Sequence, residues 1–83
     1  MKKLGKAIIA TRNKNILVKI KRKTQLGLKV YDNKLRNIGF IYDIIGPIKN
    51  PYAVIKTDTS RIKPETLIGK VLYIEDRKRW KKR

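Results

Sequence analysis

The stretch DIIGPIKNPYAVIK, residues 43–56, places two turn signals between two apolar runs. Pro47 and Pro51 each fix the backbone angle φ and lack an N–H donor, while Gly46 can adopt conformations that other residues avoid. We therefore expect a rigid loop that joins two strands. Ser, Asp, Asn and Gly are the usual residues of such a connection, but this one also carries the apolar side chains of Ile45, Ile48 and Tyr52. A rigid apolar loop of this kind indicates a docking surface.

The rest of the chain shows further short strands separated by polar turns. Their apolar residues are often β-branched and either cluster or alternate with polar ones, which is typical of strands. The predicted strands comprise residues 4–10, 15–21, 26–30, 38–45, 52–56 and 67–74. No long segment has apolar residues at helical spacing. The pattern predicts an all-β fold, a small closed six-stranded β-barrel formed by residues 1–75, because closure removes exposed sheet edges.

The predicted strand 38–45 is apolar on both sides. Strict alternation would put Ile38, Phe40, Tyr42 and Ile44 on one face and Gly39, Ile41, Asp43 and Ile45 on the other. Such a strand is covered twice, once by the core and once by a second strand layer or a partner protein. Because Asp43 lies within this run, we expect a buried carboxylate with a structural role. It would accept hydrogen bonds from the turn at Gly46 or pair with a cation of a partner.

The chain is strongly basic. Its 23 Lys and Arg residues against six Asp and Glu residues give a formal net charge of +17. Most of these cations have no acidic residue to pair with, and a positive field of this size attracts polyanions such as nucleic acids. The composition therefore predicts a nucleic acid as a direct or indirect partner. The alternative is the generic basicity of a protein from a thermophile or from an AT-rich genome.

Several kinds of chemistry are excluded by composition. The chain contains no Cys and no His, so it offers no thiol nucleophile, no imidazole base and no zinc site of the usual kind. Its glycines form no phosphate-binding motif, and its carboxylates show no catalytic pairing. We expect no catalytic residue, metal, cofactor or small-molecule ligand. No apolar run is long enough to span a membrane and no secretory signal is present, so the expected location is cytoplasmic.

The last residues, 76–83, form a separate basic segment with the sequence DRKRWKKR. Cations at this density repel one another, so we expect an extended tail outside the barrel. Its Trp could stack on a base while the cations follow phosphates, or the tail could serve only to keep the protein in solution. The candidate RNA-binding residues of the tail are Arg77, Lys78, Arg79, Trp80, Lys81, Lys82 and Arg83.

Two functions fit these features, a free-standing basic RNA-binding barrel of the ribosomal-protein type and a protein-binding subunit of an RNA-modifying enzyme. The block DxxGPxxxPY favours the second function; it comprises Asp43, Gly46, Pro47, Pro51 and Tyr52. Together with Gly39, Gly69, Tyr73 and the basic tail, this block resembles the archaeal Gar-type subunit of H/ACA small ribonucleoproteins. The resemblance covers nearly the whole chain. A related assembly-factor family shares the barrel core and differs in length.

The resemblance implies a barrel like those of translation-factor domains, monomeric when free, that binds the catalytic domain of a dyskerin-type pseudouridine synthase. Such a subunit performs no chemistry itself. It acts in pseudouridine synthesis, rRNA processing and ribosome biogenesis by helping substrate RNA load and product RNA leave. It meets guide RNA and rRNA through the complex.

The resemblance and the docking loop together identify candidate partner-binding residues. They are Ile41, Tyr42, Ile45, Gly46, Pro47, Ile48, Pro51 and Tyr52. The alternative is a well-packed turn within the barrel, which applies most to Gly46 and Pro47 because any tight turn favours such residues. Structural roles are expected for Gly39, Asp43 and Gly69.

Overall fold

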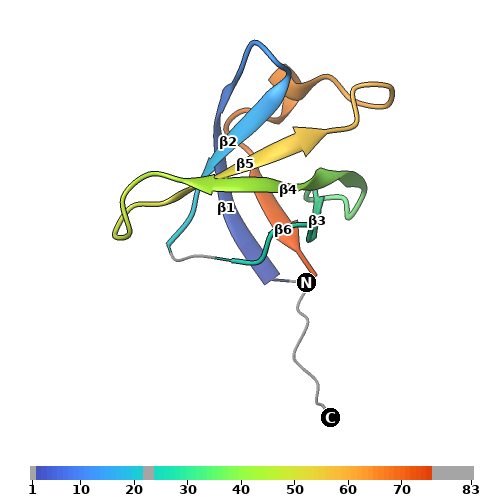
Figure 1. The fold of residues 1–83 in the computed structure, drawn as a ribbon. Helices are drawn as coiled ribbons and strands as arrows, with labels where there is room; N and C mark the ends of the chain where they lie inside the picture. The colour runs from blue at the N-terminus through green and yellow to red at the C-terminus, as the bar shows by residue number, and fades with distance from the viewer. Residues whose placement is uncertain (1, 22–23, 76–83) are drawn as a thin grey trace.

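The computed structural model describes residues 2–21 and 24–75, so the predicted RNA-binding tail, residues 76–83, lies outside the described part of the chain. The described residues form one closed antiparallel β-barrel (Figure 1) with the strand order β1-β2-β5-β4-β3-β6. The strands are β1 (Lys2–Ala10), β2 (Asn15–Lys19), β3 (Lys29–Tyr31), β4 (Asn37–Ile45), β5 (Tyr52–Thr57) and β6 (Val71–Ile74). The predicted six-stranded barrel is confirmed.

Three of the predicted strands are longer than the observed ones, since β2 ends at Lys19 and not at Lys21. The region 26–30 contributes only β3, and the region 67–74 only β6, which follows the short 3-10 helix η1 (Pro64–Leu67). Pro64 suits the first turn of η1, where its missing N–H has no partner to lose, and Leu67 is buried in the core. Within residues 2–21 and 24–75, no helix is long and apolar enough to cross a membrane.

The barrel interior is filled by aliphatic side chains from all six strands. Burial of such side chains is the main favourable contribution to folding. The buried core comprises Leu4, Ala7, Ile16, Val18, Ile20, Leu28, Val30, Ile38, Ile41, Ala53, Ile55, Leu67, Leu72 and Ile74. Among the described residues, no aromatic side chain belongs to this core. The aromatic rings of the barrel therefore lie wholly or partly on its outer surface.

Strand β4 contains two bulges that decide which of its side chains point inwards. Against β3, Val30 pairs with Gly39 and Tyr31 with Asn37, so Ile38 is an extra residue. Against β5 the register shifts between Ile41 and Asp43, which makes Tyr42 a second extra residue. An extra residue reverses the alternation at that point. The side chains in or against the core are Ile38, Ile41 and Ile44, and the predicted two-face alternation is wrong.

The second bulge also moves Asp43 to the surface. Its side chain is exposed, and Oδ1 accepts a hydrogen bond from the backbone N–H of Ile44 at 2.8 Å. The expectation of a buried Asp43 is therefore wrong, because the bulge places both Tyr42 and Asp43 opposite the outer face of β5. The contact that Asp43 makes is nevertheless a structural one within the strand.

Gly39 lies where β4 and β5 approach each other most closely. A Cβ atom on Gly39 would collide with the backbone carbonyl oxygen of Lys56, so any other residue would push the two strands apart. Gly69 donates its N–H to the carbonyl of Ala7 at 2.8 Å in the turn before β6. Both glycines thus have positions that fit their predicted structural roles.

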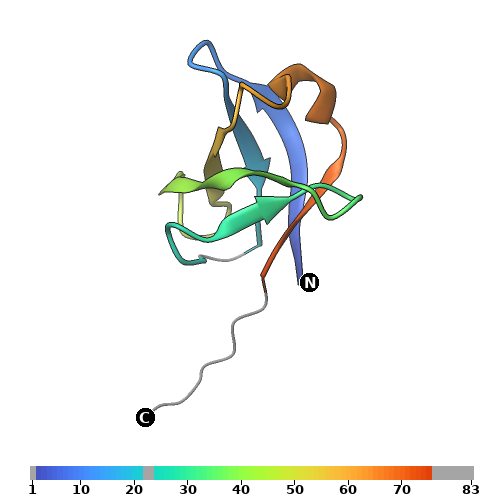
Figure 2. The same cartoon turned by 90° about the vertical axis from the view of Figure 1, so that its right-hand side faces the viewer.

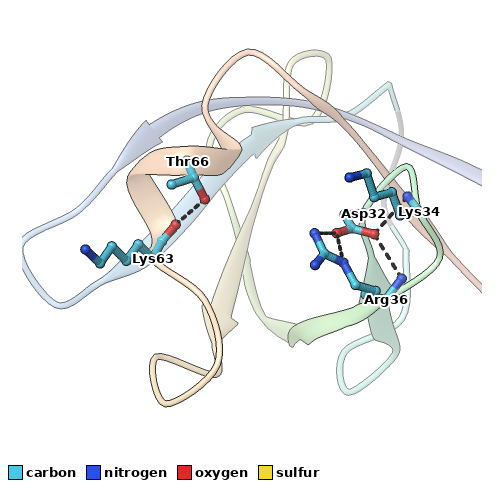
Figure 3. Close-up of polar contacts among 5 residues, drawn as sticks. All are labelled: Asp32, Lys34, Arg36, Lys63 and Thr66. Atoms are coloured by element: carbon cyan, nitrogen blue, oxygen red, sulfur yellow. Dashed lines mark hydrogen bonds and ion pairs between the residues drawn. The ribbon is translucent and has the colours of Figure 1, made fainter.

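The buried carboxylate of the barrel is Asp32, in the turn between β3 and β4. Its side chain is 2% exposed. Oδ1 accepts hydrogen bonds from the backbone N–H groups of Lys34 and Arg36, each at 2.9 Å, and Oδ2 lies 2.9 Å from the Arg36 guanidinium (Figure 3). Burial raises the pKa of Asp32, but these hydrogen bonds and the charge of Arg36 outweigh burial and hold the pKa below its ordinary value.

A second local hydrogen bond lies at the start of η1, where the hydroxyl of Thr66 donates to the carbonyl of Lys63 at 2.7 Å (Figure 3).

We expect Asp32→Asn to lower the free energy of unfolding by about 1–2 kcal/mol at neutral pH, because an amide loses the charge-assisted bonds to Arg36. The folded-state pKa of Asp32 is lowered, so its stabilisation is complete above the unfolded pKa of about 3.9 and is lost as the pH falls through the folded pKa. The difference between wild type and variant should therefore shrink from about pH 5 to about pH 2 in urea denaturation. A constant difference would contradict this account.

The matched control is Asp58→Asn. Asp58 pairs with Arg61 at 3.7 Å, and both side chains are substantially exposed. Solvent screens such a pair, so its loss should change the unfolding curve less than the loss of the Asp32 charge does.

Candidate docking face

The loop between β4 and β5 extends away from the body of the barrel (Figure 1). Asn50 donates its backbone N–H to the carbonyl of Pro47 at 3.1 Å, which closes a β-turn with Ile48 and Lys49 at its tip. Gly46 has a φ of +93°, in the left-handed region that favours glycine. The predicted loop between the two strands is therefore present as a closed turn, and its tip carries an isoleucine.

Ile48 is the most exposed large apolar side chain among the described residues, with 82% of its surface accessible to solvent. Isoleucine brings no advantage to a β-turn, since turns favour Gly, Pro, Asn, Asp and Ser for their backbone properties. The side chain is also absent from the buried core. Neither the turn nor the core of the barrel therefore accounts for an apolar residue at this position.

Further apolar side chains extend from Ile48 onto the outer surface of β4 and β5. Ile45 and Tyr52 are opposite each other across the two strands. A Cβ atom on Gly46 would lie 3.3 Å from Cδ1 of Tyr52, so the ring of Tyr52 covers the start of the loop. Tyr42 is 56% exposed. We call this surface the docking face and define it as Tyr42, Ile45, Gly46, Pro47, Ile48 and Tyr52.

The edge of the docking face is positively charged. The Nζ atom of Lys56 lies 5.7 Å from the centroid of the Tyr42 ring, a cation–π geometry that holds the ring and the ammonium group together. Lys49 is exposed beside Ile48 in the turn. The face thus combines an apolar centre with a cationic edge.

Two residues predicted to contact a partner do not belong to this face. Ile41 is 1% exposed and lies in the core, since the bulge follows it and only Tyr42 turns outwards. Pro51 is also fully buried, and its carbonyl accepts a hydrogen bond from the backbone N–H of Ile20 at 3.2 Å. Pro51 therefore fastens the base of the loop to the end of β2. The prediction that Ile41 and Pro51 form part of the docking surface is wrong, because both side chains are buried.

Three neighbours of the docking face are not among the predicted partner-binding residues. Phe40, 40% exposed, lies opposite Lys56 on the outer surface. Val54 lies opposite Leu17 of β2, and both are half-buried. These pairings extend the apolar surface from β4 across β5 to β2. The sequence alone shows Leu17 as an apolar residue on the outer face of its strand, because Ile16 and Val18 point inwards. Which residues lie next to Leu17 is decided by the strand register.

The docking face consists of apolar and aromatic side chains with lysines at its edge. Within the described part of the chain, no group of three or more Asp, Glu, His or Cys residues is placed to hold a metal ion. Asp43, the carboxylate next to Tyr42, accepts its hydrogen bond from a backbone N–H of its own strand. What the face offers a partner is apolar area, aromatic rings and lysine charge.

Comparison with known proteins shows one clear similarity. A protein of Methanothermobacter thermautotrophicus, described as uncharacterized, is 35% identical to this chain over 88 aligned residues. The aligned region comprises 100% of this chain and 95% of the other protein. No protein-family model matches the chain.

We expect Ile48→Glu to change the free energy of unfolding by less than about 0.5 kcal/mol, because a side chain on the surface has little packing to lose. Ile41→Ala should lower the same quantity by about 2–5 kcal/mol, because it empties a position in the core. Urea denaturation of both variants measures the contrast. A large destabilisation by Ile48→Glu would place Ile48 in the core and remove the basis of the docking face.

Proposed function

The chain belongs to the same family as the Methanothermobacter protein, and we propose that it is the Gar-type, non-catalytic subunit of an H/ACA guide-RNA pseudouridylation complex. In this role it docks on the catalytic domain of a dyskerin-type pseudouridine synthase. It promotes the loading of substrate RNA and the release of product RNA during rRNA processing. The observation that carries the proposal is the exposed Ile48 at the tip of a fixed loop.

The block that resembles the Gar-type subunit has a consistent physical meaning in the barrel. Gly46 adopts the left-handed conformation that starts the turn, and Pro51 anchors the end of the loop through its carbonyl. Tyr52 packs beside Gly46. Apart from Asp43, whose contact lies within β4, the residues of the block thus either shape the loop or form the surface that the loop displays. This division of roles supports the interpretation of the loop as a docking element and not as an incidental turn.

A preformed loop is favourable for binding a partner. Association costs conformational entropy wherever side chains or loops must be ordered, and a loop held by two prolines and a backbone hydrogen bond has little of this entropy left to lose. Aromatic residues such as Tyr42 and Tyr52 are frequent hot spots of interfaces. The exposed Lys49 and Lys56 at the edge would form the polar rim that surrounds an apolar interface core.

The proposed action is a shift of conformational population in the synthase. A subunit accelerates loading and release when it binds one position of a mobile substrate-gripping loop more tightly than the other positions. Such a shift changes the rate of the conformational steps, which limit turnover in many enzymes, and leaves the chemical step to the synthase. No acid, base or nucleophile of the barrel is needed.

We expect the purified protein to bind the purified synthase without RNA at about 0.5 M salt, where contacts driven by charge alone are screened. Ile48→Glu should weaken this binding at least about tenfold, because it introduces a charge into the apolar centre of the interface. Isothermal titration calorimetry measures the affinities. The matched control is Leu35→Glu, since Leu35 is also an exposed apolar residue, at 60%, but lies in the turn at the other end of β4.

Two results would contradict the docking function. One is equal affinity of the wild type and of Ile48→Glu for the synthase. The other is binding to RNA alone, only at low salt and without any synthase contact, which would instead favour a free-standing basic RNA-binding barrel.

We also expect the protein to raise the multiple-turnover rate of pseudouridine formation several-fold and to leave the single-turnover rate of prebound substrate unchanged. The reason is that loading and release contribute only to the first of these rates. Rapid-quench measurements on guide-RNA complexes, assembled with and without the protein, give both rates. An equal increase in the single-turnover rate would assign the protein a role in the chemical step.

A further inference from the structure

A basic groove with a volume of about 910 Å³ lies next to the start of β1 and the end of β2. In both views the start of β1 is at the lower end of the barrel, and the chain runs downwards as it leaves β2 (Figures 1 and 2). Six exposed lysines line the groove, and no acidic residue is among its described lining. We call this hollow the lysine groove; its cations are Lys2, Lys3, Lys6, Lys19, Lys21 and Lys49.

The strand register explains why these lysines gather. Residues 2–6 of β1 pair with β6 and residues 6–10 pair with β2, which puts Lys6 directly opposite Lys19. The hydrogen bond from Ile20 to Pro51 brings the β4–β5 loop, with Lys49, to the end of β2. Buried Leu4, Ile20 and Ile74 form the apolar floor. Three segments that are distant in the chain thus contribute cations to one hollow.

The arrangement works against the stability of the barrel. Like charges directly opposite each other on antiparallel strands are destabilising, and Lys6 and Lys19 form such a pair. Both ion pairs found among the described residues, Asp32 with Arg36 and Asp58 with Arg61, involve none of the groove lysines. The groove lysines lower the stability of the barrel, and no acidic residue in the described lining offsets their charge. This combination indicates a ligand that supplies the negative charge.

We propose that the lysine groove binds the phosphodiester backbone of a single-stranded nucleic acid such as RNA. A concave site with cations on several sides surrounds a narrow charged chain, whereas a flat membrane would touch only the rim. Lysine acts on phosphate as a point charge and needs no fixed geometry. No aromatic residue is among the described lining, so the groove lacks the rings on which bases stack. Backbone contacts of this kind bind RNA without sequence preference.

The lysine groove adjoins the docking face. Lys49 follows Ile48 in the same turn, and Lys19 lies opposite Tyr52 across β2 and β5. A protein partner on the docking face and an RNA strand in the lysine groove would therefore be neighbours. Lys2, Lys3, Lys6 and Lys21 lie outside the docking face and its rim, so binding in the groove does not depend on the proposed docking function.

The test compares two triple variants of the full chain that lose the same charge. The groove variant is Lys3→Gln, Lys6→Gln and Lys21→Gln, which leaves Lys19 and Lys49 beside the docking face intact. The control variant is Arg12→Gln, Lys34→Gln and Lys63→Gln, at exposed positions outside the groove lining. Fluorescence anisotropy with oligouridine of about 12 nucleotides measures binding at several salt concentrations.

We expect the groove variant to bind oligouridine at least about tenfold more weakly at low salt, with a salt slope smaller by about 2, since each lost phosphate contact on a single strand removes about 0.7. The control variant should stay within about threefold of wild type. Because the groove variant removes the like-charge pair, its melting temperature should be equal to that of wild type or higher. Retained synthase binding at high salt would separate this site from the docking face.

Two results would overturn the proposal. Equal loss of RNA affinity in both triple variants would mean that only net charge matters. Tighter wild-type binding to polyglutamate or to phosphatidylserine vesicles than to oligouridine, with the same sensitivity to the groove variant, would assign the lysine groove to an acidic protein or to a lipid surface.

Discussion

The two extra residues of β4 are the constraint on which the other features of this barrel depend. Ile38 and Tyr42 are each inserted against a neighbouring strand, and each insertion bends the strand and changes which side chains point inwards. Ile38, Ile41 and Ile44, which are three residues apart, then lie in or against the core. The bent strand pairs with β3 along one edge and with β5 along the other. The same insertions send Tyr42 and Asp43 outwards together. The outward position of Tyr42 in the docking face is therefore a consequence of the second bulge.

The β4–β5 loop separates residues that hold the fold from residues that are available to a partner. Pro51 is buried and bonded to the end of β2, whereas Ile48, at the tip of the turn, is exposed. Because Pro51 anchors the base of the loop, the turn at its tip forms without packing of Ile48 against the core. Changes at the tip therefore affect binding with little effect on folding, and changes at Pro51 or Ile41 affect folding first.

The charges of the barrel follow a similar division. Asp32 and Asp58 are engaged with groups in their own turns, where they accept backbone hydrogen bonds and pair with a nearby arginine. These local contacts stabilise turns and do not neutralise the lysines around the groove. The stability of the fold depends on the aliphatic interior, so the barrel tolerates a strong positive field on its surface. That field is available to a polyanion.

Local properties of the chain were sufficient to predict the all-β barrel, its number of strands and the rigid loop after Ile45. Alternation and turn chemistry act between neighbouring residues. The bounds of β1, β2, β4 and β5 accordingly lie within two residues of the predicted ones. The positions of Ile41, Asp43 and Pro51, the burial of Asp32 and the pairing of Lys6 with Lys19 could not be predicted this way. Each of them depends on bulges, on strand register or on contacts between distant segments. Such relations exist only once the strands have paired, because a single inserted residue reverses the faces of everything that follows it.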